Sequence, residues 1–335
     1  MSTYQALVCT HWGHWSELEL QQLERPTLKP GQVRIRVHHA GVGFALSLFV
    51  AGKYQRKPPL PFTPGTEAAG EIIELSPDVQ HLQLGQRVTC ALDWGAFAQE
   101  AVVTAATVYP VPASVPLSLA AAIPITYGTV WSALEWKAKL HKGQTILIHG
   151  AGGALGMAAV QIAHLKGARV IATASTEEKR NAALANGADY ALPSDAEALP
   201  ALVKGLCPAG GADVVFDPVG GDLFDASLRC VASHGLLLVI GFASGRIAQI
   251  PSNLLLLKNA SVSGFNYGQY IGWGLTDERV HYAAKVAQVI QQVLQAVDEK
   301  SMPIPQTQHF AFSDWLKAIG TTMSRKSIGK VILDF

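Results

Sequence analysis

The sequence carries little charge. Charged residues make up 15% of its 335 positions, against about 25% in a typical soluble domain, and the formal net charge is +1. This balance provides no field that would hold nucleic acid or an anionic membrane surface, so we expect neither as a partner. Hydrophobic residues make up 49% of the chain, which excludes extensive disorder and predicts a large core.

Cysteine is also scarce. The four cysteines, Cys9, Cys90, Cys207 and Cys230, are far apart and include no C-x-x-C pair. This spacing excludes a disulfide framework and predicts isolated buried or surface thiols. The N-terminal MSTYQALVCTHWGHW lacks the basic segment and continuous apolar run of a secretory signal, so we expect a cytoplasmic protein.

One window has the composition of a membrane span. Residues 145–163, TILIHGAGGALGMAAVQIA, contain no Asp, Glu, Lys or Arg and have about the length of a spanning helix. Its glycines separate a β-branched run from a helical run, which predicts a strand, a tight turn and a helix. We therefore expect no membrane-spanning segment.

The pattern of the chain changes along its length. Up to about residue 111, short β-branched runs alternate with turns that contain Pro and Gly, which is typical of an antiparallel barrel or sandwich. From about residue 120, strands alternate with helices, which predicts a doubly wound parallel sheet. The final segment has little core of its own and is expected to pack on the first part. The predicted α/β architecture has a β-rich domain of residues 1–121 and 266–335 and a Rossmann domain of residues 122–265.

The strongest chemical signal is HGAGGALG at 149–156, between a predicted strand and a predicted helix. Glycine permits positive φ and lets backbone N–H groups approach a pyrophosphate at the positive end of the helix dipole. A glycine-rich turn alone is also compatible with a simple tight connection, but the surrounding βαβ pattern favours a dinucleotide. The expected cofactor-binding residues are Gly152, Gly153, Ala154, Leu155 and Gly156.

The end of the next predicted strand indicates which dinucleotide. NAD-binding domains usually place an Asp or Glu there, whereas this chain reads ATASTEEKR at 172–180, with Ser175 at the strand end. A hydroxyl followed by Lys179 and Arg180 suits a 2′-phosphate and predicts NADPH. The alternative is that residues 177–180 form only the solvated first turn of a helix.

Longer segments carry a resemblance to a known family. They are KYQRKPPLPFTPGTEAAGEI at 53–72, YGTVWSAL at 127–134, GAGGALGMAAVQIA at 150–163, DPVGG at 217–221, VIGFASG at 239–245 and SIGKVIL at 327–333. Together they resemble the medium-chain dehydrogenase/reductases over essentially the whole chain, and among these the zinc-independent NADPH:quinone oxidoreductases. The resemblance implies a GroES-like domain, an inserted coenzyme domain, a cleft between them and commonly a homodimer.

The resemblance also implies roles for single residues. Tyr54 and Thr129 would be catalytic residues near the nicotinamide, Gly241 and Phe242 would lie along the cofactor, and Arg325 would lie near the 2′-phosphate. By residue type alone, Tyr54 is equally compatible with a half-buried aromatic whose hydroxyl caps the core.

Zinc is not expected. Zinc-bearing relatives place a Cys near position 44 and a His-Glu pair at the G-x-E motif, whereas this chain has Phe44 and Thr66 followed by Glu67. His38 and His39 are adjacent, so on a continuous strand they point to opposite faces, and we interpret them as edge or surface histidines. Ser47 and Phe49 also depart from the family pattern, which leaves the acceptor and any proton relay open.

These features predict NADPH-dependent, zinc-independent reduction of a quinone, in which catalysis depends on positioning a flat acceptor against the nicotinamide. The first alternative keeps the cofactor and reduces the C=C bond of an enone, enal or enoyl thioester. The second is a nucleotide-bound structural or RNA-binding protein, against which the near-neutral charge argues.

Overall fold

The computed structural model describes residues 3–207 and 210–335; residues 1–2 and 208–209 lie outside it. The chain divides into two compact units. Unit 1 comprises Met1–Gly128, Gly268–Glu299 and Thr307–Phe335, and unit 2 comprises Thr129–Tyr267 and Lys300–Gln306. The first division lies between Gly128 and Thr129, seven residues after the boundary of 121/122 expected from the sequence. Successive helical turns run from Leu117 to Lys137, so no loop marks the boundary. Residues 300–306 belong to unit 2, where the Gln161 side chain donates to the carbonyl of Ile304 at 3.3 Å.

Unit 1 is built on strands. They are β1 (Thr3–Val8), β2 (Glu19–Glu24), β3 (Gln32–Val42), β4 (Glu67–Leu75), β5 (Arg87–Ala91), β6 (Glu100–Thr104), β7 (Val108–Pro110), β14 (Thr307–Ala311) and β15 (Lys330–Asp334). β1 and β2 form a hairpin, and the main sheet has the order β14-β15-β3-β4-β5-β7, with β6 also paired to β3. In β3, Val33, Ile35 and Val37 are buried in the core of the unit, and the Arg34 between the first two is buried as well.

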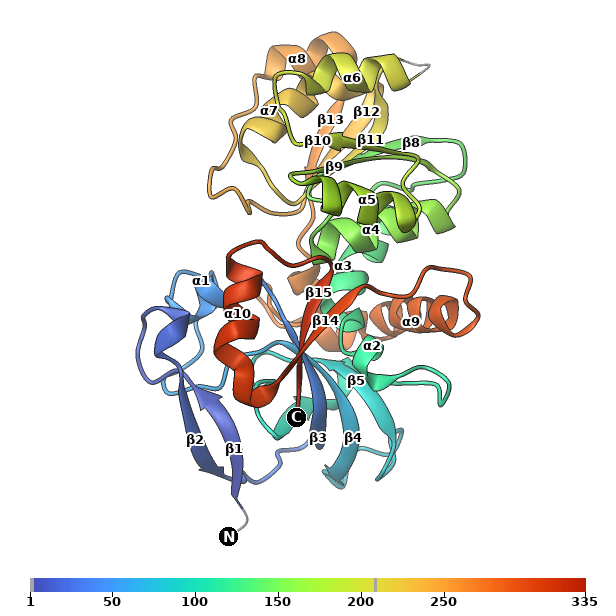
Figure 1. Cartoon of the computed structure of the whole chain (residues 1–335). Coiled ribbons are helices and arrows are strands. Elements are labelled where there is room, and N and C mark those ends of the chain that lie inside the picture. The colour runs from blue at the N-terminus through green and yellow to red at the C-terminus, as the bar shows by residue number, and fades with distance from the viewer. Residues whose placement is uncertain (1–2, 208–209) are drawn as a thin grey trace. The chain divides into compact units, whose positions relative to one another are not determined.

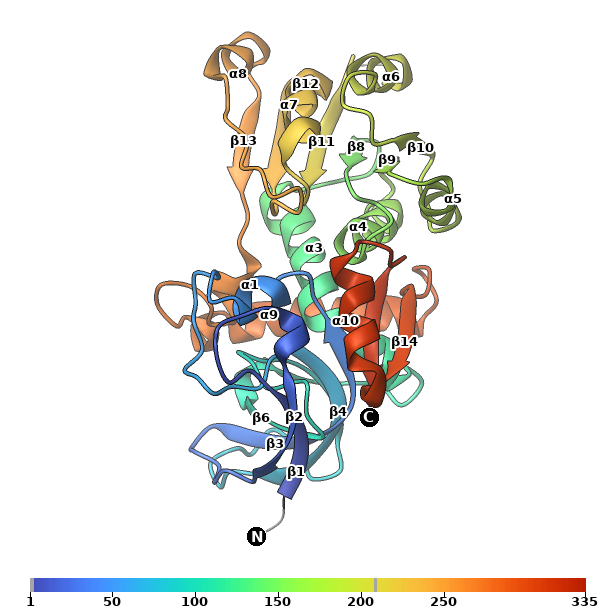
Figure 2. The same cartoon turned by 60° about the vertical axis from the view of Figure 1, so that its left-hand side comes forward.

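The helices of unit 1 are mostly short. They are α1 (Leu46–Val50), α2 (Leu117–Ala120), the π-helical turn Ile123–Tyr127, α9 (Arg279–Asp298) and α10 (Trp315–Met323), with 3-10 turns at Trp15–Glu17, Ala105–Thr107 and Phe312–Asp314. A further 3-10 turn, Tyr267–Ile271, begins at the end of unit 2. The sequence predicts helices at about 277–299 and 313–323, and α9 and α10 lie close to these bounds. α10 packs on β14 and β15 (Figure 2).

The C-terminal segment completes the sheet of unit 1. β15 pairs antiparallel with β3, with Val331 opposite Val42 and Asp334 opposite His39. β14 pairs parallel with β15 on its other side. β3 thus pairs with a strand nearly 300 positions away in the sequence. The strands of the first 110 residues therefore do not complete the main sheet without the C-terminal segment.

Unit 2 is a parallel sheet with helices on both faces. Its strands are β8 (Thr145–Ile148), β9 (Arg169–Ala174), β10 (Tyr190–Pro193), β11 (Ala212–Asp217), β12 (Val231–Val239) and β13 (Ser261–Gly264), in the order β10-β9-β8-β11-β12-β13. The helices are α3 (Gly128–Ser132, which begins at the last residue of unit 1), the π-helical turn Ala133–Lys137, α4 (Ala154–Leu165), α5 (Glu177–Ala185), α6 (Leu199–Leu206), α7 (Gly221–Cys230) and α8 (Ser252–Lys258). α4 and α5 cover one face, and α6, α7 and α8 cover the other (Figure 1).

This sheet confirms the predicted combination of a β-rich part and a doubly wound Rossmann part. The apolar window at 145–163 is divided into β8, a glycine turn and most of α4, as its glycines predict. In the part of the chain that the structure describes, no helix combines the length and hydropathy needed to cross a membrane. The four cysteines are buried and free.

Candidate functional site

The glycine turn between β8 and α4 has the shape that a pyrophosphate requires. Gly150 has a φ of +63°, and Gly153 is the N-cap of α4, with no side chain to occupy the N–H groups of the first turn. A Cβ on Gly156 would lie 2.2 Å from the carbonyl oxygen of Gly150, so only glycine lets the helix start this close to the turn. The backbone around Ala154 and Leu155 therefore has the geometry with which a phosphate could be held.

Lys179 lies against this turn. A Cβ on Gly152 would be 2.6 Å from both Cγ and Cδ of Lys179, so the aliphatic part of the lysine covers the glycine. Burial lowers the pKa of Lys179, and the nearby Glu178 carboxylate opposes this shift. A phosphate beside the ammonium would favour its charged form, which makes the position suitable for an anionic ligand.

The residues around Lys179 have distinct environments. Ser175 is exposed just after β9, with no carboxylate beside it at the strand end. Thr176 caps α5 by accepting from the backbone N–H of Lys179 at 3.3 Å. Arg180 donates to the carbonyl of Ala174 at 3.3 Å, so its guanidinium has a structural partner. Of the two cations that the sequence offers for a 2′-phosphate, Lys179 is the one beside the glycine turn.

Two further turns meet at the same edge of the sheet. After β11, the carboxylate of Asp217 accepts from the backbone N–H groups of Val219 at 2.7 Å and Gly220 at 2.9 Å. After β12, Phe242 lies against Gly220, where a Cβ would be 3.1 Å from its ring, and Gly241 packs on Pro218. β8 and β11 are neighbours at the point where the strand order reverses, which is where doubly wound sheets bind ligands.

Asp217 and His149 are site-supporting residues that the sequence reasoning missed. His149 is fully buried at the end of β8, with Nδ1 2.9 Å from the Thr173 hydroxyl and Nε2 2.6 Å from the Ser227 hydroxyl. Burial lowers its pKa, which keeps the imidazole neutral. The DPVGG and HGAGG segments contain these residues, but only the completed sheet gives them their partners.

Tyr54 belongs to unit 1 and forms part of an aromatic cluster. Its ring stacks on Phe49 with centroids 4.1 Å apart and planes at 24°, and Phe49 in turn meets the edge of Trp273 at 6.3 Å. Phe49 is buried, so it supports Tyr54 from beneath and is not itself an exposed aromatic wall. Burial raises the pKa of the half-buried Tyr54 phenol, which is therefore protonated near neutral pH.

An ion-pair network holds the loop that follows Tyr54. Arg56 donates to Asp93 at 2.5 Å, and the same carboxylate receives the buried guanidinium of Arg279 at 2.8 and 3.1 Å. Asp277 binds Nε of Arg279 at 2.9 Å. The members of this network come from distant segments, and sequence reasoning gave no signal for them.

The remaining expected site residues lie on helices or directly after them. Thr129 is buried in α3, between the two π-helical turns, a type of distortion that occurs often at functional sites. Arg325 follows α10 with a φ of +57°, and its guanidinium carbon is 5.8 Å from the centroid of the Phe44 ring. Tyr54 and Arg325 thus belong to unit 1, whereas Thr129, Lys179 and Phe242 belong to unit 2.

The donor set that a catalytic zinc ion needs does not fit this chain. Phe44 offers no ligand, and the buried carboxylate of Glu67 forms an ion pair with the buried ammonium of Lys330 and accepts from the backbone of Ile125 at 3.1 Å. Among residues 3–207 and 210–335, His39, His309 and Asp334 form the one group with three or more metal-ligand atoms close together.

Comparisons with known proteins agree with this arrangement. The alcohol dehydrogenase GroES-like domain family matches residues 29–113, and the zinc-binding dehydrogenase family matches residues 154–286. Quinone oxidoreductase-like protein 2 of Mus musculus is 40% identical over 268 residues, which cover 80% of this chain and 76% of the mouse protein. The homologue of that protein in Nematostella vectensis is 36% identical over 336 residues, covering 99% and 89% of the two chains.

A solved structure of similar sequence extends over the whole chain. The quinone oxidoreductase of Thermus thermophilus, also determined in complex with NADPH, is 31% identical, has a TM-score of 0.82 and covers 99% of this chain and 100% of its own. The strands of unit 1 thus correspond to a GroES-like domain and those of unit 2 to a Rossmann domain. The chain is an oxidoreductase that belongs to the quinone oxidoreductase family of the medium-chain dehydrogenase/reductases.

Proposed function

We propose that this oxidoreductase reduces a quinone with NADPH and needs no metal ion. The observation that carries the proposal is the packing of Lys179 over Gly152, beside a glycine turn shaped for phosphates and a strand end without an acid. NADH has no 2′-phosphate and so cannot form an ion pair with the Lys179 ammonium. The NADPH complex of the Thermus thermophilus relative, 31% identical, supports the same cofactor.

We assign the binding of the cofactor mainly to unit 2. The turn from Gly152 to Gly156 receives the pyrophosphate on the N-terminal N–H groups of α4. Ser175 and Lys179 hold the 2′-phosphate, with Arg325 as a further cation for it. Gly241 and Phe242 lie along the rest of the cofactor, in the turn after β12 that packs on Pro218 and Gly220. NADPH supplies the hydride.

Tyr54 and Thr129 are proposed to orient the acceptor. The half-buried Tyr54 ring, which the buried Phe49 backs, is a flat partner for a planar acceptor, and an aromatic contact of this kind contributes about 0.5–1.5 kcal/mol beyond area burial. A quinone suits such a surface, because its reduced form takes protons from water and needs no strong acid from the protein. A simple ketone would need polarisation of its carbonyl, for which the proposed residues offer no cation.

The second candidate is reduction of a conjugated C=C bond. Hydride addition to an enone must be followed by protonation of the adjacent carbon, and the Tyr54 phenol is the group among the proposed acceptor residues that would have to supply this proton; burial raises its pKa, which makes it a weak acid for the task. Thioesters of coenzyme A would further require a basic patch for the phosphates of the carrier.

Steady-state NADPH oxidation by the purified protein distinguishes these functions. A panel of quinones, enones and enoyl thioesters should give the highest kcat/KM with quinones, and simple alcohols should not be oxidised with NADP⁺. If enones or thioesters exceeded quinones, the second candidate would replace the first. If no acceptor were reduced although NADPH bound, the assignment of a quinone reductase would be wrong.

A further inference from the structure

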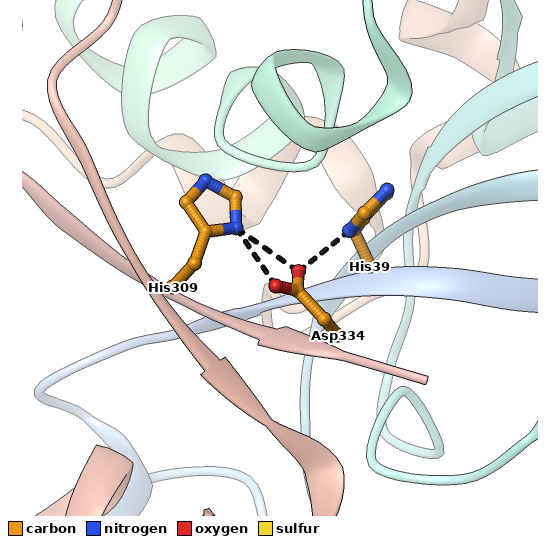
Figure 3. Close-up of side chains that lie close together, drawn as sticks. All are labelled: His39, His309 and Asp334. Atoms are coloured by element: carbon orange, nitrogen blue, oxygen red, sulfur yellow. Dashed lines mark hydrogen bonds and ion pairs between the residues drawn. The ribbon is translucent and has the colours of Figure 1, made fainter.

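Three polar side chains from distant parts of the sequence meet at one end of the sheet of unit 1. Asp334 lies on β15, opposite His39 on β3, and it stands two positions beyond Ile332, the partner of His309 on β14. Alternate residues of a strand share a face, so the register places all three side chains on one face of the sheet. Figure 3 shows both imidazole rings turned toward the carboxylate.

The distances are those of a compact donor set. Nδ1 of His39 is 2.7 Å from Oδ1 of Asp334, and Nδ1 of His309 is 3.0 Å from Oδ1 and 3.1 Å from Oδ2. One ligand atom from each of the three residues can be chosen so that all lie within 4.8 Å of one another. Ligands bound at about 2.0–2.1 Å in tetrahedral geometry are roughly 3.3 Å apart. A metal ion would therefore require the Asp334 oxygen and each imidazole Nδ1 to separate by a few tenths of an ångström, and the two imidazole nitrogens to reach the same spacing from within 4.8 Å.

The surroundings of the cluster also suit a metal ion. Nε2 of His309 lies 3.0 Å from the Thr307 hydroxyl, and a partner of this kind on the second ring nitrogen is the usual way in which a ligating histidine is oriented. The side chains of His39, His309 and Asp334 are 24%, 35% and 36% exposed, so an ion can enter from solvent and keep water as a further ligand.

The alternative explanation is that Asp334 merely accepts a hydrogen bond from Nδ1–H of each imidazole. That arrangement is compatible with metal binding, because each ring needs only to move its proton from Nδ1 to Nε2. His309 would then donate its Nε2–H to Thr307. The donors in the cluster select the metal: imidazole nitrogen favours zinc and similar transition metals over magnesium or calcium.

We propose that His39, His309 and Asp334 bind one divalent transition-metal ion of the zinc type, which ties the last strand of the chain to β3 and β14. The site is built from residues that take no part in the proposed reduction. Its existence is independent of the acceptor and of the cofactor.

Titration of the full-length protein, without a histidine tag and after removal of metal by a chelator, tests this proposal. Isothermal titration with Zn²⁺ should give one saturable site per chain, and Zn²⁺ should raise the melting temperature, because it binds the folded form. Co²⁺ should give visible absorption bands of a site with nitrogen and oxygen ligands. Failure to observe saturable binding of one equivalent would overturn the proposal.

Variants locate the ion. His309→Gln and Asp334→Asn should each weaken Zn²⁺ binding by more than about 10-fold, while Thr307→Ala, which removes the outer partner, should have an effect of about 10-fold or more in the same direction. His81→Gln, at an exposed histidine elsewhere in unit 1, is the matched control and should bind as the unmodified protein does. Melting curves without metal verify that each variant is folded. Equal affinities in the unmodified protein, His309→Gln and Asp334→Asn would show that the ion binds elsewhere.

Discussion

Replacement of Lys179 with alanine should reduce the preference for NADPH over NADH. The aliphatic part of Lys179 packs over Gly152, which directs the side chain toward the glycine turn between β8 and α4. Arg180, by contrast, donates to the backbone of Ala174. The variant therefore removes the cation that the structure places at the turn, while the cap of α5 by Thr176 remains.

The size of the effect follows from the exposure of Lys179. A hydrogen bond to a charged group contributes about 1.5–3 kcal/mol when it is well shielded. Lys179 is only partly buried, and salt screens exposed charges, so we expect the lower end of this range, or roughly a 10-fold weaker binding of NADPH. NADH lacks the phosphate, so its dissociation constant should not change.

Isothermal titration of both cofactors with the unmodified protein, Lys179→Ala and Lys204→Ala provides the test. Lys204 is an exposed lysine on α6 of the same unit, so its removal changes the net charge without touching the turn. The ratio of the two dissociation constants should fall only in Lys179→Ala. Equal affinities for NADPH and NADH in the unmodified protein would refute the reasoning, as would an unchanged ratio in that variant.

The same lysine predicts a pH dependence. Burial lowers the pKa of Lys179 in the free protein, whereas a bound phosphate favours the protonated ammonium. NADPH affinity should consequently decrease as the pH rises through this lowered pKa. The decrease should be absent in Lys179→Ala, and its persistence there would assign the titration to another group.

Four further predictions concern the acceptor, the metal, the assembly and the core. Tyr54→Phe should retain most of kcat with quinones, because only a positioning hydroxyl is lost; a decrease beyond about 10²-fold would indicate that Tyr54 donates a proton. Dialysis against a strong chelator should leave quinone reduction unchanged, and stoichiometric zinc lost together with activity would contradict this. Sedimentation at micromolar concentration should show a homodimer. We expect its interface to include β13, the terminal strand of its sheet, and Leu257, which is 78% exposed. Leu257→Glu should therefore yield monomers, and a monomeric unmodified protein would refute the assignment. Lys330→Met should lower the free energy of unfolding by about 3–5 kcal/mol, measured by denaturant titration, because Glu67 is then left buried without its cation; a loss below 1 kcal/mol would mean that water reaches this carboxylate.

The coenzyme half of the protein could be predicted from its sequence because its signals are local. The strand, the glycine turn and the helix from 145 to 165 are contiguous, and periodicity and residue type suffice to identify them. β10 was missed, because Tyr190–Pro193 is a half-exposed edge strand of four residues that contains no β-branched residue and ends in proline. Its existence depends on pairing with β9 and not on its own composition.

The functional candidates in unit 1 are in contact only in the folded chain, so the sequence gives little indication of their partners. His39 and Asp334 are 295 positions apart, and the interpretation of His39 as an edge histidine gave no indication of the carboxylate that it contacts. Phe49, which departs from the family pattern in the sequence, is buried and stacks against the ring of Tyr54. No periodicity in the sequence specifies which of these two aromatic side chains is buried and which is partly exposed.

This difference explains why the cofactor could be inferred with more detail than the acceptor. A 2′-phosphate has a fixed charge and shape, so its recognition requires particular groups at a particular strand end, and Ser175 and Lys179 stand there. A flat acceptor requires mainly an apolar surface held at a fixed position. In the proposed function the stacked Tyr54 provides that surface, and the buried Arg279 with its two carboxylates holds the loop that follows Tyr54. Since quinones and enones fit such a surface equally well, the chemical difference between them reduces to whether the Tyr54 phenol must give up its proton.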